Sequence, residues 1–450
     1  MSRYLEGRKL TPAQFKADIQ ADDEDAVRKF LYGYLGPTMF SELKAAHDEG
    51  GDIYAALYEL DDDELVRLLC ALGERAHVVL GNGSIPDETG VPAAEERKRD
   101  QNKKARRLLV QAGVDVGKKD RFISPGALAH NKFFVRTSKN GDLLTAWTGS
   151  TNWTTTGLCT QLNNGLLIRD PGIATEYMHQ WERLRDAASA FPPSLIDANS
   201  TEKPFQAPPS RVRRAFTRFD TPPPASTGTI WFTRTRDKVD LDALNAEVMA
   251  AKVGILFLMF MPGGNGVLPA VQKAAANPDF YVRGVVSQLP TPSKSKKTKD
   301  QDVVHVDVVK DAVTKRLSMK IVEPRGNNNP ISKWAVAELT RGQFTASVGR
   351  AIVHSKAMVI DPFTEHPVVI TGSHNFSDQA STGNDEKFII IIRDDPPLAE
   401  AYAVHIMSAY DHYRYRAAQQ ENLGLHRTDD WMKDKLDQDS QELRVWNVRS

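Results

Sequence analysis

One block of residues occurs twice in this chain, and the repeat constrains the fold more than any other feature. The first copy reads His130-Asn131-Lys132-Phe133-Phe134-Val135 and then Thr148-Gly149-Ser150-Thr151-Asn152-Trp153. The second reads His354-Ser355-Lys356-Ala357-Met358-Val359-Ile360-Asp361 and then Thr371-Gly372-Ser373-His374-Asn375-Phe376. The interval from the histidine to the glycine is 19 residues in the first copy and 18 in the second. Repetition of so many features at one spacing predicts two similar halves.

Helix and strand patterns alternate in both halves. Helical periodicity predicts helices over residues 39–47, 63–72, 240–251 and 267–275. Apolar runs predict buried strands over 76–80, 253–261 and 280–286, and the apolar segment 53–60 fits either state. This alternation predicts βα units that feed a mostly parallel sheet in each half.

Proline marks the boundary between the halves. Eight prolines fall between residues 191 and 227 without any sustained period, so this stretch is predicted to be an extended linker. The chain is therefore expected to comprise an N-terminal extension, a first half, the linker, a second half and a C-terminal tail, at residues 1–36, 37–190, 191–227, 228–420 and 421–450.

Charge and composition exclude several classes of protein. The chain has 450 residues, and its 58 Lys and Arg balance 58 Asp and Glu. A net charge of zero argues against binding nucleic acid or an anionic membrane by bulk charge alone, although basic clusters occur at 97–107 and 294–299. Cys70 and Cys159 are too few for a disulfide scaffold, and no cluster of cysteine and histidine has zinc-site spacing.

The sequence indicates a cytoplasmic protein without a transmembrane segment. Residues 1–9 contain no apolar core of a secretory signal. The longest apolar run, 253–261, has about half the length that a bilayer requires.

The paired residues of each block suit chemistry on an anion. Each His-x-Lys and each Ser-x-Asn element spaces its two polar residues so that both point to one face of a strand. Two copies brought face to face would surround one pocket with two imidazoles, two ammonium groups, hydroxyls and amides. Lysines and amides stabilise the non-bridging oxygens of a phosphodiester, while one imidazole attacks phosphorus and the other protonates the leaving oxygen. The candidates are His130, Lys132, Ser150 and Asn152, and His354, Lys356, Ser373 and Asn375.

These doubled blocks resemble the phospholipase D superfamily, whose signature His-x-Lys-x-x-x-x-Asp occurs twice. The resemblance covers most of residues 40–420 in organisation. It implies an α/β fold, a bilobal pseudodimer of two mixed β-sheets flanked by helices with one active site at the interface. It also implies a two-step reaction without metal or cofactor, through a covalent phosphohistidine that water or an alcohol resolves.

The resemblance assigns further residues. Asp361 completes the second signature and is expected to be structural, whereas the first copy has Thr137 in that place, which implies weaker support rather than lost catalysis. In the family each catalytic histidine is oriented by an acidic residue from the opposite half. Glu386 fits this role in the second copy, but the first copy has the amides Asn163 and Asn164 there, which are expected to help bind substrate.

This difference leads to a hypothesis about the two histidines. His130 would be backed by the carboxylate of Glu386, and His354 only by an amide. A carboxylate behind an imidazole fixes its tautomer and stabilises its cationic, phosphorylated form. We therefore expect His130 to be the nucleophile and His354 the general acid, with Lys132, Lys356 and Glu386 completing the catalytic set.

Several substrates fit such a site. Phospholipid headgroups are favoured because both blocks are fused in one neutral chain, and this choice implies peripheral contact with a membrane. A metal-independent endonuclease acting on DNA or RNA is the alternative, because the spacing of the second block resembles small bacterial endonucleases of the superfamily. Cardiolipin-synthase-like transfer ranks third, because bacterial versions usually carry N-terminal membrane helices. An inactive phosphate-binding module would explain Thr137 and the missing first acidic residue.

Overall fold

The computed structural model describes most of both halves. The described residues are 12–83, 100–116, 129–187, 192–207, 225–262, 265–275, 277, 279–287, 309–310, 317–318, 321–322, 353–383, 388–420 and 445. Glu386 and the basic segment 294–299, both singled out from the sequence, lie outside the described residues.

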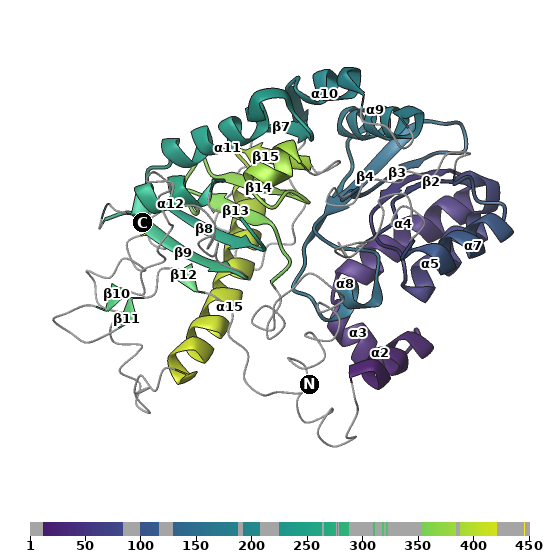
Figure 1. Ribbon diagram of the computed structural model, residues 1–450, viewed down its shortest axis with the longest axis horizontal. Helices are drawn as coiled ribbons and strands as arrows, with labels where there is room; N and C mark the ends of the chain where they lie inside the picture. The colour runs from purple at the N-terminus through teal and green to yellow at the C-terminus, as the bar shows by residue number, and fades with distance from the viewer. Residues whose placement is uncertain are drawn as a thin grey trace, which may run out of the picture.

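The first lobe is built on a five-stranded sheet with the order β2-β1-β3-β4-β5. Its strands are β1 (Ile53–Leu57), β2 (Ala76–Leu80), β3 (Lys132–Thr137), β4 (Leu143–Gly149) and β5 (Gly165–Ile168). One face is covered by α4 (Leu35–Glu49), α5 (Asp63–Leu72) with the turn η1 (Gly73–Arg75), and α7 (Lys103–Gln111); the other is covered by α9 (Pro171–Ala187). Helices α2 (Pro12–Ala21) and α3 (Ala26–Tyr32) pack beside α8 (Thr155–Cys159) (Figure 1).

The second lobe has an eight-stranded sheet with the order β12-β9-β8-β13-β14-β15-β7-β6. Its strands are β6 (Lys203–Ala207), β7 (Ser226–Phe232), β8 (Gly254–Met259), β9 (Tyr281–Val286), β12 (Ile321–Val322), β13 (Ala357–Ile360), β14 (Val368–Gly372) and β15 (Phe388–Arg393). Its helices are η2 (Arg236–Lys238), α11 (Val239–Ala250), α12 (Leu268–Ala275), α14 (Asp378–Thr382) and α15 (Pro396–Gln420). A separate pair is formed by β10 (Val309–Lys310) and β11 (Leu317–Ser318).

Both sheets are mixed, and they share the same arrangement of parallel and antiparallel strands. Strands β1 and β2 pair in parallel, as do β8 and β9, whereas the motif strands β3 and β13 pair antiparallel with both of their neighbours. The expectation of mostly parallel sheets was wrong, and the mixed sheets implied by the family resemblance are confirmed. The reason lies in the connections: a turn over residues 138–142 joins β3 to β4, and such a short link permits only an antiparallel pair.

Part of the stretch expected to be an extended linker is regular structure. Helix α10 (Pro193–Asn199) begins at a proline, where a missing N–H costs nothing, and β6 pairs with β7 as the edge strand of the second sheet. An edge strand tolerates Pro204 because its unpaired side faces away from the sheet. The proline content that suggested a linker therefore also fits a helix start and a sheet edge.

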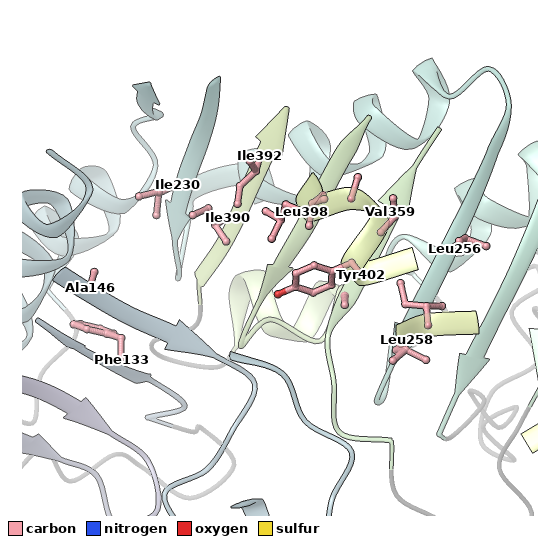
Figure 2. Close-up of a cluster of buried hydrophobic side chains, with 14 of the residues drawn as sticks. Phe133, Ala146, Ile230, Leu256, Leu258, Val359, Ile390, Ile392, Leu398 and Tyr402 are labelled. Carbon is pink, nitrogen blue, oxygen red and sulfur yellow. The ribbon is translucent and has the colours of Figure 1, made fainter. Parts of the chain in front are cut away.

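A hydrophobic cluster between the two sheets joins the lobes. Tyr177 of α9 packs edge-on against Phe133 of β3 and against Phe232 of β7, with ring centroids 5.1 and 5.4 Å apart. Figure 2 shows Phe133 on the first sheet and Tyr402 of α15 against the second, within the same cluster. Phe134, the next residue of β3, points to the opposite face and packs in the cluster beneath α4 and α5. Because the lobes share a core, the junction between them is a fixed surface.

Asp361 and Thr137 tie equivalent corners of the two lobes. The carboxylate of Asp361 accepts the backbone N–H groups of residues 252, 253 and 254 at 2.6–3.1 Å, just before β8. In the first lobe the hydroxyl of Thr137 accepts only the N–H of Asp52, at 3.0 Å. Gly51 is required at this corner, because an added Cβ would lie 2.0 Å from the carbonyl oxygen of Thr137. The threonine thus provides a weaker form of the aspartate's support.

Removing these two ties should have unequal effects on stability. We expect Asp361→Ala to lower the free energy of unfolding by about 2–4 kcal/mol, because it leaves three backbone donors without an ionised acceptor. Thr137→Val should cost about 1 kcal/mol, since one neutral hydrogen bond is lost. Urea denaturation measures both, and equal losses would contradict this account of the two corners.

Candidate active site

The two His-x-Lys elements meet at the junction of the lobes. The imidazole rings of His130 and His354 have centroids 6.3 Å apart and planes inclined at 64°, and each side chain is 5 % exposed. Lys132 and Lys356 are completely buried beside them. The Lys132 ammonium donates to the carbonyl of His130 at 3.0 Å, and the Lys356 ammonium donates to that of His354 at 2.6 Å. The duplicated sequence block therefore forms one cationic site.

An aromatic ring lies under each His-Lys pair. The Tyr58 ring centroid is 4.9 Å from that of His130 and 4.9 Å from the Lys132 ammonium. In the second lobe Phe260 is 4.7 Å from both His354 and its lysine. An aromatic face attracts a cation, so these rings stabilise the buried ammonium groups. Sequence reasoning missed both residues, although each lies within a predicted apolar segment and the two occupy equivalent places, directly after β1 and β8.

His354 is oriented by an amide from the first lobe. Its Nδ1 lies 2.8 Å from Asn163 Oδ1, which also accepts from the hydroxyl of Ser150. Asn163 Nδ2 donates to the carbonyl of Gly157 at 2.9 Å and to Gln161 at 3.2 Å, which fixes the amide with its oxygen toward the imidazole. The neutral ring of His354 therefore carries its proton on Nδ1 and its lone pair on Nε2. Ser150, fully buried, supports Asn163 and is not placed to touch substrate.

The amide of Asn164 connects the two lobes. Its Nδ2 donates to the hydroxyl of Thr371 at 2.7 Å and to that of Tyr402 at 3.2 Å, both in the second lobe. Its Oδ1 accepts from Ser150 at 3.1 Å. Both ends of the amide are thus engaged within the protein, and the contact of Asn164 with substrate stays a prediction. A second link lies nearby, where the carbonyl of Leu162 accepts the N–H groups of residues 354 and 355 at 3.0 and 2.8 Å.

The Ser-x-Asn elements of the two copies have different surroundings. Asn152 Nδ2 donates to Glu59 Oε2 at 2.6 Å, and Glu59, which follows β1, was not anticipated from the sequence. Among the described residues, Oδ1 of Asn152 and Oδ1 of Asn375 are buried without a hydrogen-bond partner. Ser373 is fully buried. Unpaired acceptors at such depth are rare, so each Oδ1 is suited to accept from a hydroxyl or N–H of a ligand, whereas a phosphate oxygen would be met by the Nδ2 group of the amide.

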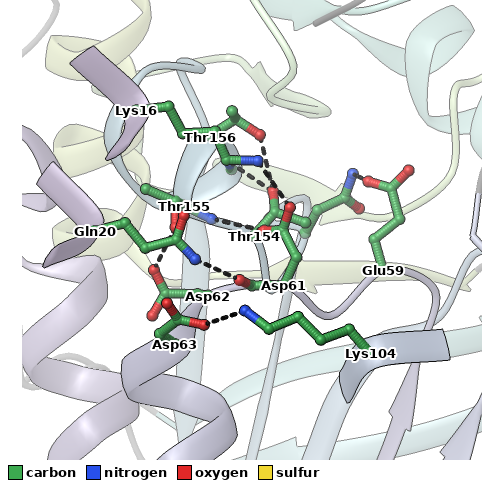
Figure 3. A network of polar contacts seen from close by, with 12 residues as sticks. Lys16, Gln20, Glu59, Asp61, Asp62, Asp63, Lys104, Thr154, Thr155 and Thr156 are labelled. Atoms are coloured by element: carbon green, nitrogen blue, oxygen red, sulfur yellow. Dashed lines mark hydrogen bonds and ion pairs between the residues drawn. The ribbon is translucent and has the colours of Figure 1, made fainter. Parts of the chain in front are cut away.

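The N-terminal helices brace the loop that leads into the site. Figure 3 shows Lys16 and Gln20 of α2 reaching the side chain and the backbone carbonyl of Asp61, at 2.9 and 3.0 Å. Arg28 of α3 makes two 3.0 Å hydrogen bonds to the buried carboxylate of Asp62, which also accepts from the hydroxyl of Thr155 in α8. Burial opposes the charge of Arg28, but the hydrogen bond and charge of Asp62 raise its pKa above the ordinary value. The loop that follows β1 and helix α8, which follows Asn152, are thereby held together.

Within the described part of the chain, no group of three histidine, cysteine or acidic residues is arranged to hold a metal ion. No helix there is long and apolar enough to cross a membrane.

A known protein family matches both lobes of this chain. The family model described as "Cardiolipin synthase, PLD-like domain" matches residues 27–185 and 283–409, which is more than half of the chain. The chain belongs to the phospholipase D superfamily. No curated protein sequence gives a significant match.

Solved structures similar to this superfamily member have low sequence identity to it. Phosphatidylserine synthase from Haemophilus influenzae Rd KW20 is 10 % identical, with a TM-score of 0.42 over 82 % of this chain and 83 % of the other. Polyphosphate kinase from Porphyromonas gingivalis is 11 % identical, with a TM-score of 0.42 over 82 % of this chain but only 43 % of the kinase. The phospholipase D family member Nuc from Salmonella typhimurium is 14 % identical, with a TM-score of 0.23 over 41 % of this chain and 95 % of Nuc.

The buried Arg28–Asp62 pair predicts a large effect of one substitution. We expect Arg28→Ala to lower the free energy of unfolding by about 3–5 kcal/mol, because it leaves a carboxylate uncompensated in the interior. Arg67→Ala is the matched control: it removes an exposed pair with Asp23 and should cost less than about 1 kcal/mol.

The same pair should control the reactivity of Cys159 in α8, where burial raises the pKa of the thiol to about 12. Native protein should resist labelling of Cys159 at pH 8. Loss of the Arg28 charge by itself would raise the pKa of the thiol further, but Arg28→Ala should accelerate the labelling because it loosens the packing that buries α8. Equal behaviour of the two arginine variants in denaturation and labelling would refute the bracing role.

Proposed function

We propose that this chain hydrolyses or transfers phosphodiesters through a phosphohistidine intermediate and acts on phospholipid headgroups. One observation carries the proposal: two buried His-Lys pairs from different lobes lie with their imidazoles 6.3 Å apart. A tetrahedral phosphorus placed between the rings can be attacked from one side while its leaving oxygen is protonated from the other.

The first step uses the two histidines in different roles. Nε2 of His130 attacks phosphorus, the bond from phosphorus to the leaving oxygen breaks, and that oxygen takes the proton of the His354 imidazolium. Lys132, Lys356 and the Asn152 amide stabilise the charge on the non-bridging oxygens. In the second step neutral His354 accepts a proton from water or an alcohol, whose oxygen displaces His130 from phosphorus. The choice of acceptor decides between hydrolysis and transfer.

The surroundings of the two rings support this division of roles. His354 donates to a neutral amide, which does not favour a lasting positive charge on the ring and suits a group that must give up its proton. For His130 we keep the assignment made from the sequence, in which the carboxylate of Glu386 stabilises the phosphorylated ring. The amide behind His354 is thus matched to a general acid and a carboxylate to a nucleophile.

The charge around the pocket favours phospholipid over nucleic acid. Glu59 places a carboxylate against Asn152, and a negative group at this point disfavours a substrate whose neighbouring phosphates repeat along a chain. Zero net charge likewise gives no long-range attraction for a polyanion. A single phosphodiester, such as that of a lipid headgroup, avoids both penalties. We propose that the protein reaches this substrate through peripheral contact with a lipid surface.

Two substrates tested side by side would decide the proposal. In the presence of EDTA, we expect release of free choline from phosphatidylcholine and no nicking of supercoiled plasmid. Quenching in alkaline detergent, which preserves the acid-labile phosphohistidine, during turnover of a lipid labelled with ³²P should trap the label on His130, and His130→Ala should abolish both turnover and label.

Other outcomes have distinct meanings. Nicking without choline release would support the nuclease and contradict the lipid substrate. Label on His354 would reverse the roles of the histidines. Inertness toward both substrates would favour a phosphate-binding module.

A carboxylate placed behind His354 should change the pH dependence in a diagnostic direction. Asn163→Asp stabilises the imidazolium form of His354, so a general acid stays protonated at higher pH. We expect the high-pH limb of kcat/KM to move upward by about one unit, with the low-pH limb unchanged.

Gln161→Ala serves as the control, because it removes a neighbour of Asn163 without adding charge and should shift neither limb. If His354 were the nucleophile, which must be neutral to attack, the substitution would instead move the low-pH limb upward. A profile unchanged on both limbs would contradict the contact between residue 163 and the catalytic ring.

A further inference from the structure

A serine, a histidine and an aspartate form a buried cluster behind the second Ser-x-Asn element. Nε2 of His374 lies 3.1 Å from Ser381 Oγ and 3.4 Å from Asp240 Oδ2. Ser381 Oγ donates to the same aspartate oxygen at 2.8 Å, and the hydroxyl of Thr235 bonds the other. The side chains of His374, Ser381 and Asp240 have no exposed surface.

This cluster is not a nucleophilic triad, although it contains the same residue types. Ser381 donates its proton to the aspartate and not to the histidine, and complete burial keeps any substrate from the serine. Burial raises the pKa of the Asp240 carboxyl, against hydrogen bonds from Thr235 and Ser381 that lower it. The contacts of His374 are therefore all with other groups of the protein, and its role is to position them.

His374 closes the turn that carries Asn375. Its Nδ1 accepts the backbone N–H of Phe376 at 2.9 Å, so the proton of the neutral ring lies on Nε2, toward Ser381 and Asp240. Phe376 has a φ of +57°, a left-handed conformation that is costly for a bulky residue and needs support from its surroundings. The ring supplies that support on one side of Asn375, while the Phe376 carbonyl accepts the N–H of Val267 at 3.0 Å on the other.

The first copy holds the equivalent turn by other means. Thr151 stands in the place of His374, and its hydroxyl donates to the carbonyl of Asn164 at 3.1 Å. The amide of Asn152 is held by Glu59. For Asn375 no side-chain bond of this kind is present among the described residues, and its Oδ1 is buried without a partner. Within the described part of the chain, the backbone turn is therefore what determines where this amide points.

We propose that His374 is a positioning residue that acts through Asn375. The buried Asp240 and Ser381 fix the tautomer and plane of the His374 ring, the ring fixes the turn at Phe376, and the turn directs an Nδ2 N–H of Asn375 toward a phosphate oxygen. The inference rests on the proposed function in one respect, namely that the site binds a phosphate group.

Two substitutions of His374 test the contacts of its two ring nitrogens separately. His374→Asn keeps a side-chain oxygen near the place of Nδ1, so the N–H of Phe376 retains an acceptor. His374→Gln places an amide nitrogen near Nε2 and leaves that N–H without one. The readouts are calorimetric binding of tungstate, a phosphate analogue, and kcat and KM for bis(p-nitrophenyl) phosphate.

The glutamine variant should show the defect and the asparagine variant should not. We expect His374→Gln to bind tungstate about tenfold more weakly and to lose kcat about tenfold with KM little changed, which is the size of one hydrogen bond to a charged oxygen. His374→Asn should stay within about threefold of the wild type on both measures. Wild-type behaviour of His374→Gln would overturn the proposal.

A double-mutant cycle with Asn375→Ala distinguishes positioning from a general loss of stability. If His374 acts through this amide, His374→Gln should add nothing to Asn375→Ala in the double variant, whereas additive losses would refute the inference. If His374→Gln does not fold, Ser381→Ala enters the same cycle. Ser381→Ala is then expected to weaken tungstate binding and lower kcat about threefold, and this loss should disappear in the Asn375→Ala background. Additive losses would refute the inference as before. A wild type that binds tungstate but cleaves no phosphodiester would refute the proposed function alone, because the binding cycle still tests His374.

Discussion

Two lysine ammonium groups are completely buried where the lobes meet, and much of the surrounding structure follows from the need to stabilise them. Moving a charge out of water is very costly unless other groups compensate for it. Each ammonium meets a backbone carbonyl and an aromatic face, Tyr58 in one lobe and Phe260 in the other. An anion placed between the two blocks would interact with both lysines at once, so the proposed phosphate substrate would offset the remaining cost of burial.

The duplicated halves share a framework but differ at the residues nearest the site. Tyr177 and Tyr402 occupy equivalent places in α9 and α15 and reach the equivalent hydroxyls of Thr148 and Thr371. The ring beside each His-Lys pair, by contrast, is Tyr58 in one lobe and Phe260 in the other. Two identical half-sites would give the two histidines identical properties. A reaction that needs a nucleophile and an acid therefore benefits from differences of this kind.

The sequence predicted the parts of the structure that repeat or follow a period. Helix α5 and strand β2 have the predicted bounds 63–72 and 76–80, because an apolar face and capping residues define them locally. The meeting of His130 and His354 could be predicted because the block is duplicated. Pairing direction could not, because it depends on the length of each connection. Glu59 and the true contacts of Asn164 were also missed, since each depends on one residue in a loop and on a partner far away in the sequence.

The N-terminal helices, for which the described part of the second lobe shows no counterpart, compensate a run of acidic side chains in the first lobe. Asp61 and Asp62 lie in the loop after β1, and Asp63 begins α5. Lys16 and Arg28 from these helices, with Lys104 of α7, engage the three carboxylates in turn. Their charge is neutralised locally, in part within the interior where solvent screens little. A chain of zero net charge can therefore keep two buried lysines at the junction of its lobes together with an acidic loop, because Lys16, Arg28 and Lys104 are the cations that pair with the three aspartates.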